Sequence, residues 1–201
     1  ERAPGEDGVV RVVFYEKDMV VPKKAGDRFE LQDYFKHPEK YKGVFDQYLQ
    51  HLSILVNCIY WDARYPRLVT KAWLKENWKD GKILRVIGDI SCDIDGAIEA
   101  TAHSADPGNP IFTYDVRSRA VQDGWEGNGP VIMAVDTLPS ELPREASTYF
   151  GNQLMPYVID IARADYHKDF ADLYLPAPIK RSVIVHKGKL TPDYEYIQKY
   201  L

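Results

Sequence analysis

The stretch "GDISCDIDG", residues 88–96, holds three aspartates in nine positions, with a glycine at each end. Carboxylates this close together can bind a hard cation, stabilise a developing positive charge or transfer a proton. The commoner use of such residues is a solvated strand end or a helix cap. The elements around the stretch have to decide among these roles.

Calcium binding is the first use to test, because an EF-hand loop needs acids at positions 1, 3 and 5, glycine at 6 and glutamate at 12. Counted from Ser91, positions 3, 5 and 6 are filled by Asp93, Asp95 and Gly96, but position 1 is a serine and position 12 is Ala102. The segment before the stretch has the pattern of a strand, not of a helix. With no CxxC or HExxH and with five scattered histidines, we expect no metal site.

Phosphate-binding and nucleophilic motifs are equally weak. The glycine-rich "GWEGNG", residues 124–129, has the wrong order for G-x-G-x-x-G and leads into a strand, and no Walker sequence occurs. If the fold binds a dinucleotide, its pyrophosphate-binding helix lies outside this sequence. Cys58 and Cys92 follow apolar strands, where cysteine usually serves as a small core residue, and no histidine is close to either in sequence.

Apolar runs and helical periodicity alternate along the chain. Residues 53–60 and 82–90 read as strands buried on both faces, and the helix between them starts at Thr70 as N-cap and stops at Gly81. This β-α-β order predicts an open α/β fold with a mostly parallel sheet and flanking helices. Further strands are expected at 9–15, 111–116, 130–136 and 182–188, and helices at 37–52, 138–165 (interrupted or kinked at Pro156) and 192–201.

In an open parallel sheet, ligands bind beyond the carboxyl ends of the strands. Three unusually polar segments fall at such ends: 57–62, 89–96 and 135–139. We therefore expect a polar crevice that brings these segments together.

Composition limits the alternatives. The chain has 201 residues, 45% of them apolar, which suits one globular domain with or without an appendage. The net charge of −4 and the scattered Lys and Arg argue against nucleic acid and anionic membranes as partners, and no apolar run is long enough for a bilayer. Two cysteines fit a reducing compartment, so we expect the cytoplasm, or the mitochondrial matrix in a eukaryote. Because the sequence opens at Glu1, we expect a piece of a longer or processed protein.

Five motifs carry a family resemblance. They are "HPEKY" (37–41), "NCIYWDARYPRLVT" (57–70), "GDISCDIDGAIE" (88–99), "DTLPSELPREAS" (136–147) and "PDYEYIQ" (192–198). In this order they resemble the NAD(P)-binding region of the alanine dehydrogenase and transhydrogenase superfamily, and within it the lysine–2-oxoglutarate reductase and saccharopine dehydrogenase branch. The resemblance implies a Rossmann-like dinucleotide-binding fold, with a mostly parallel sheet and flanking helices, of which the fingerprint half is absent from this sequence. It further implies a two-domain oxidoreductase, using NAD or NADP, that interconverts lysine plus 2-oxoglutarate and saccharopine.

The resemblance also assigns roles to matched positions. Asp93 matches an acidic residue beside the nicotinamide, where it would stabilise positive charge on the nicotinamide or imine nitrogen. Asp95 stands where the family commonly has glycine, and Asp89 is expected to position the loop. The remaining cofactor-binding positions are Ile90 and Ser91 at the same edge, Asn57, Cys58 and Ile59 towards the ribose and central phosphates, and Val135, Asp136 and Leu138 over the carboxamide.

The resemblance divides the chain into a strand and loop (1–36), the C-terminal half of the dinucleotide-binding domain (37–165) and an extension (166–201) that packs towards a missing N-terminal domain. That missing part would supply the phosphate loop and the acid and base, so this piece alone is expected to be inactive. The expected ligands are the dinucleotide and an amino-acid or 2-oxo-acid substrate, and a homo-oligomer stays open. Alternatives are a dehydrogenase of another amino acid and a non-catalytic dinucleotide-binding or assembly module.

Overall fold

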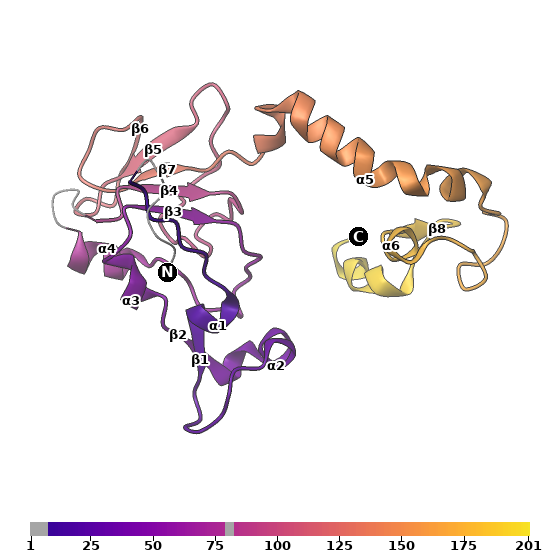
Figure 1. Cartoon of the computed structure of the whole chain (residues 1–201), viewed down its shortest axis with the longest axis horizontal. Helices are drawn as coiled ribbons and strands as arrows, with labels where there is room; N and C mark the ends of the chain where they lie inside the picture. Colours follow the sequence, from indigo (N-terminus) through magenta and orange to yellow (C-terminus); the bar gives the residue numbers. More distant parts are fainter. Residues whose placement is uncertain (1–7, 79–82) are drawn as a thin grey trace. The chain divides into compact units, whose positions relative to one another are not determined.

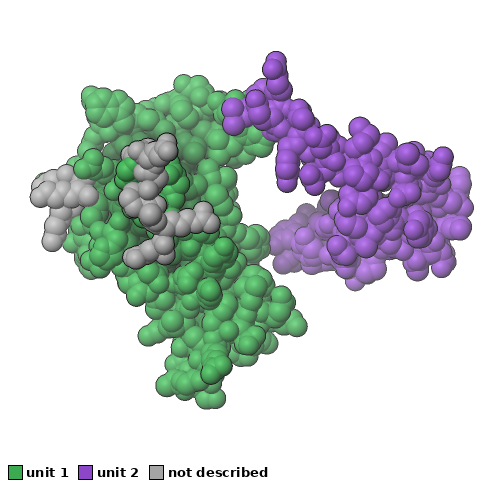
Figure 2. Space-filling view, viewed as in Figure 1, with its two compact units in different colours: residues 1–141 green, residues 142–201 purple. Residues whose placement is uncertain are grey.

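The computed structural model describes residues 8–78 and 83–201 (Figure 1). The chain divides into two compact units, Glu1–Glu141 and Leu142–Leu201, which Figure 2 shows in green and purple. Each unit is described by itself.

The first unit is built on a five-stranded sheet in the order β3-β4-β7-β5-β6 (Figure 1). Strands β3, β4 and β7 are parallel, and β5 and β6 extend the sheet antiparallel as a hairpin. The predicted α/β fold with a mostly parallel sheet is confirmed. The strands are β3 (Ile54–Asn57), β4 (Val86–Asp89), β5 (Ile111–Tyr114), β6 (Val121–Asp123) and β7 (Val131–Met133).

One face of this sheet forms the core. Leu55 pairs with Ile87, Ile87 with Ile132, and Ile132 with Phe112, so a single row of apolar side chains crosses four strands. These four side chains are at most 6% exposed, and they belong to one cluster with residues of α3 (Asp46–Leu49) and α4 (Lys71–Asn77). The crossover helix of a β-α-β unit packs back on the sheet, and it therefore covers this face of the parallel strands.

Helix α4 begins as the sequence predicts. Thr70 is its N-cap, and the Thr70 hydroxyl accepts a 3.1 Å hydrogen bond from the backbone N–H of Trp73. Leu74 is fully buried, and Trp73 and Trp78 pack against the core. The predicted stop at Gly81 lies outside the described residues.

The opposite face of β3 corrects the expectation of a strand buried on both sides. Ile54 is 62% exposed and Val56 59% exposed, whereas Leu55 and Asn57 are buried. In the described residues β3 is packed on one face only, and a continuous apolar run does not reveal which faces of a strand are covered.

Two elements in the first 52 residues were predicted wrongly. Residues 9–15 belong to no strand; Phe14 instead packs on Phe45, with ring centroids 5.1 Å apart. Residues 37–52 form no continuous helix, because a strand pairing takes the middle of the segment and Gly43 approaches Pro66 so closely that a Cβ would lie 2.8 Å from the proline ring. The elements here are α1 (Glu16–Met19), β1 (Val20–Pro22), α2 (Leu31–Lys36), η1 (Pro38–Lys40) and β2 (Tyr41–Gly43), with β1 and β2 antiparallel, followed by α3.

The second unit consists of one long helix and small elements. Helix α5 (Pro143–Arg163) continues through Pro156, which corrects the alternative of an interruption there. Its apolar positions include Phe150, 66% exposed, and Val158, 43% exposed. In the described chain no helix has both the length and the apolar character to cross a membrane. The other elements are α6 (Ala177–Arg181), β8 (Val185–His186) paired with β9 (Lys189–Leu190), and η3 (Pro192–Tyr200).

Candidate functional site

The ends of β3 and β4 meet through two buried polar residues. Asn57 and Asp89 are the last residues of these strands and are paired in register. They are 2% and 1% exposed, and the Asn57 side-chain amide donates a 2.8 Å hydrogen bond to Asp89 Oδ1. The polar ends of two neighbouring strands are therefore joined at the predicted crevice.

Both oxygens of the buried Asp89 carboxylate have partners. Oδ2 accepts a 2.6 Å bond from the hydroxyl of Thr101, which is fully buried. Oδ1 also accepts a 3.3 Å bond from the backbone N–H of Cys92. A buried carboxylate persists only when it is hydrogen-bonded in this way. Asp89 thus holds the loop that follows β4, as the sequence led us to expect.

The loop at 90–96 is sharply bent. Cys92 and Asp95 have φ angles of +55° and +50°, a left-handed conformation that favours glycine and that aspartate tolerates better than most residues. The thiol of Cys92 donates a 3.0 Å bond to the carbonyl of Ala134, just after β7. The loop after β4 is therefore tied to β7 on one side, while Asp89 ties it to β3 on the other.

Asp93 lies in this loop and is half-buried. Burial raises the pKa of its carboxyl, and the negative charge of Asp89 raises this pKa further. An ionised Asp93 is therefore poorly compensated by the protein itself. Such a carboxylate is suited to stabilise a positive charge that arrives with a ligand or develops in a reaction.

The backbone around the β3 end binds the same loop. The N–H of Ile90 donates a 2.9 Å bond to the Asn57 carbonyl, and the Ser91 hydroxyl donates a 2.5 Å bond to the Ile59 carbonyl. Ile90 is 37% exposed. Four of the predicted residues therefore lie together at one edge.

Cys58 and Cys92 are both free thiols, but they differ in burial. Cys58 is exposed, which corrects its interpretation as a small core residue; the side chain after the last buried position of β3 points away from the core. Cys92 is partly buried, and burial raises the pKa of its thiol, as do the negative charges of Asp89 and Asp136.

The third strand end contributes differently from the other two. Val135 is only 2% exposed as a whole residue, so it belongs to the core. Asp136 is exposed and within electrostatic range of Cys92. Leu138 is half-buried at the start of η2 (Leu138–Ser140).

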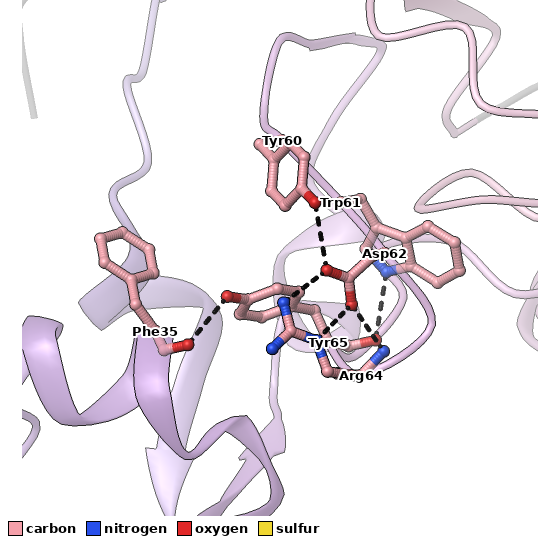
Figure 3. A network of polar contacts seen from close by, with 6 residues as sticks. All are labelled: Phe35, Tyr60, Trp61, Asp62, Arg64 and Tyr65. Atoms are coloured by element: carbon pink, nitrogen blue, oxygen red, sulfur yellow. Dashed lines mark hydrogen bonds and ion pairs between the residues drawn. The ribbon is translucent and has the colours of Figure 1, made fainter. Parts of the chain in front are cut away.

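The loop after β3 is stiffened by its own polar contacts (Figure 3). The guanidinium of Arg64 binds both oxygens of Asp62, at 3.0 and 2.8 Å, and lowers the pKa of Asp62 to about 2. Tyr60 donates a further 3.2 Å bond to Asp62. The indole N–H of Trp61 donates to the carbonyls of Tyr65 and Pro66, so the loop folds back on itself.

A small cavity of about 260 Å³ lies beside this loop. Its wall is mainly aromatic and aliphatic, with one carboxylate, one guanidinium and the exposed thiol of Cys58. Among the lining residues are Glu16, Tyr34, Cys58, Ile59, Tyr65 and Arg67.

The sequence also matches known proteins. Residues 11–193 match the family model described as alanine dehydrogenase/PNT, C-terminal domain. The chain belongs to this family. A relative from Arabidopsis thaliana, "Alpha-aminoadipic semialdehyde synthase", is 38% identical over 184 residues, which are 91% of this chain and 17% of the relative. A mitochondrial relative of the same name from Bos taurus is 30% identical, over 88% of this chain and 21% of the relative.

A more distant relative is the "Saccharopine dehydrogenase [NAD(+), L-lysine-forming]" of Emericella nidulans, 27% identical over 72% of this chain and 36% of the relative. The chain thus spans about a fifth of the length of the first two relatives.

In this alanine dehydrogenase/PNT domain, sequence reasoning missed two groups that hold the site. Thr101 supports Asp89 from twelve residues downstream, and no spacing rule signals such a contact. Arg67 reaches the backbone of the Asp93 loop from the loop after β3. Its place in the motif at residues 57–70 was the signal available in the sequence. Within the described residues, no cluster of three or more His, Cys, Asp or Glu could hold a metal ion.

Proposed function

We propose that this chain is part of a longer NAD(P)-dependent oxidoreductase that interconverts lysine plus 2-oxoglutarate and saccharopine. The observation that carries the proposal is Asp93, a half-buried carboxylate with a raised pKa at the joined strand ends. The family match and the names of the relatives supply the reaction class.

In this proposal the dinucleotide lies across the carboxyl ends of β3, β4 and β7. Ile90 and Ile94, 37% and 60% exposed, offer apolar surface to a flat ring beside Asp93. Asp136 and Leu138 would contact the carboxamide end, next to the buried Val135. Cys58 and Ile59 would face the ribose and phosphates, and the buried Asn57 would hold the end of β3 in place through Asp89. Either NAD or NADP fits these groups.

A nicotinamide, when bound, supplies the hydride transfer. The task of the described residues is to bind and orient it and to offset charge. Ionised Asp93 would stabilise a positive nitrogen at the reacting centre, because a fixed carboxylate in a partly dry site acts more strongly than one in water. Asp89 would hold Asp93 at its place through the Cys92 backbone.

The exposed face of β3 indicates where further protein belongs. A parallel sheet is normally covered on both faces, yet Ile54 and Val56 are largely exposed. We propose that the remainder of the dinucleotide-binding domain, with its phosphate loop, and a substrate domain cover this side and close the crevice. The acid and base of the reaction would come from those parts. In a eukaryote the expected location is the mitochondrial matrix. The Bos taurus relative is named as a mitochondrial protein.

The test uses the full-length protein that contains this chain. NADPH and NADH oxidation is followed with lysine plus 2-oxoglutarate, and with pyruvate plus ammonia in parallel. Oxidation that requires both lysine and 2-oxoglutarate supports the proposal. Oxidation with the second pair alone would assign a dehydrogenase of another amino acid, and dinucleotide binding without oxidation by any pair would leave a binding module.

A further inference from the structure

Arg67 lies in the loop after β3 but bonds to the loop after β4. Its Nε donates a 3.1 Å hydrogen bond to the carbonyl of Gly96, and one terminal nitrogen donates a 2.8 Å bond to the carbonyl of Asp95. The guanidinium also stands over the ring of Trp61, 5.2 Å from its centroid. The planar guanidinium of Arg67 thus stacks on a ring of its own loop and donates two hydrogen bonds to the neighbouring loop.

The backbone that Arg67 holds is the backbone that places Asp93. The N–H of Gly96 donates a 2.9 Å bond to the Asp93 carbonyl, closing the turn. A Cβ at Gly96 would lie 2.4 Å from the Cβ of Asp93 and 2.7 Å from its carbonyl oxygen, so the turn is as tight as glycine allows. Any shift of the 95–96 peptide would therefore move Asp93.

A second cation reinforces the same turn. Lys71, the first residue of α4, places its ammonium 2.5 Å from Asp95 Oδ1. This contact gives a reason for aspartate at a left-handed position that favours glycine, since the side chain gains a partner that glycine would lack. The backbone N–H of Lys71 also donates to Glu99, further along the same segment.

The geometry points to Arg67 as a positioning residue for Asp93. It fixes the loop after β4 relative to the loop after β3, so that Asp93, Cys58 and Ile59 face one ligand as a unit. The inference rests on the proposed function for its kinetic consequence, but the loop geometry can be tested without turnover.

The kinetic experiment compares Arg67→Ala with Arg64→Ala in the full-length protein. Arg64 is the matched control, because its guanidinium is in the same loop but pairs with Asp62 inside that loop. Arg67→Ala is expected to lower kcat by about tenfold or more while the KM for the dinucleotide changes less, since a small displacement of a catalytic group costs rate. Arg67→Lys, which keeps the charge but not the fork, is expected to fall between the parent and the alanine variant.

Added guanidinium chloride at low concentration is expected to restore part of the kcat of Arg67→Ala, and to do nothing for Asp93→Asn. Equal kcat values for the Arg67 and Arg64 variants, or a loss that follows the unfolded fraction and is not restored by guanidinium, would overturn the inference.

Hydrogen–deuterium exchange on the same full-length variants separates this inference from the proposed function. Arg67→Ala is expected to speed exchange by about an order of magnitude in peptides covering 90–97 and to leave β4 protected. If the parent shows no saccharopine activity, the proposed function fails while this measurement still decides the role of Arg67. Unchanged exchange at 90–97 would show that Arg67 does not hold the loop.

Discussion

Asn57 and Asp89 end two neighbouring parallel strands, and their side chains are joined by a 2.8 Å hydrogen bond that is almost fully hidden from solvent. The carboxylate of Asp89 also binds Thr101 and the backbone of Cys92. This one buried group therefore links two strand ends, the loop that carries Asp93 and the segment beyond it. Replacing Asp89 should therefore change both the stability of the domain and the pKa of Asp93.

Asp89→Ala is expected to destabilise the protein by about 3 kcal/mol, because it leaves the buried amide of Asn57 and the hydroxyl of Thr101 without their acceptor. Urea denaturation of the full-length protein measures the change in the free energy of unfolding of this domain. Asp123→Ala, on the exposed strand β6, is the control and is expected to change stability by about 0.5 kcal/mol or less. A similar loss in both variants would contradict the network.

The pH dependence of kcat tests whether the charge of Asp89 raises the pKa of Asp93. Burial and the Asp89 charge raise the pKa of Asp93, so Asp93 takes up a proton at a higher pH than an ordinary aspartate, whose pKa is about 3.9. Protonated Asp93 cannot stabilise a positive charge, so kcat should fall as the pH drops through this raised pKa.

The fall of kcat at low pH is the acid limb of the pH profile. Asp89→Asn removes the charge of Asp89 and should move this acid limb to lower pH. Thr101→Val removes a hydrogen bond to Asp89 but keeps its charge, so the limb should stay in place. Asp95, Asp136 and Lys71 are unchanged in both variants. An acid limb at the same pH in the parent and in Asp89→Asn would refute the coupling.

Asp93→Asn is expected to lower turnover by about a hundredfold, with a much smaller effect on dinucleotide affinity, because the amide keeps the shape but not the charge. Steady-state kinetics and dinucleotide fluorescence titration measure the two quantities separately. Parent-like turnover would remove Asp93 from the mechanism.

The hydroxyl of Thr70, the N-cap of α4, is expected to stabilise the protein. Thr70→Ala should cost about 1 kcal/mol of stability, since the N–H of Trp73 loses its acceptor, and Thr70→Ser should restore most of it. Thermal unfolding of the three proteins provides the comparison, and an alanine variant as stable as the serine variant would argue against the cap.

The two thiols should differ in reactivity. Cys58 is exposed, whereas Cys92 is partly buried, donates to the Ala134 carbonyl and has a raised pKa. Iodoacetamide at neutral pH should therefore label Cys58 first, as peptide mapping would show. Faster labelling of Cys92 would mean that the loop opens in solution.

Sequence patterns predicted the structure correctly where the interactions span only a few residues. The β-α-β order of residues 53–90 and the cap at Thr70 follow from periodicity and one hydroxyl, and the structure contains both. The predicted helix over 37–52 failed because Tyr41–Gly43 pairs with another strand and Gly43 packs on Pro66. Helical spacing of apolar residues does not reveal a distant partner.

By itself, the sequence determined the α/β class and the polar strand ends, and its family motifs led to the proposal that Asp93 acts at the site. Only the tertiary structure decided how those ends are joined. Asp89 is a buried linker, Cys58 is exposed, and Arg67 reaches across to the 95–96 backbone. The physical reason is that hydrogen bonds between segments tens of residues apart depend on strand register and loop direction. These are set by the packing of the whole sheet and not by spacing along the chain.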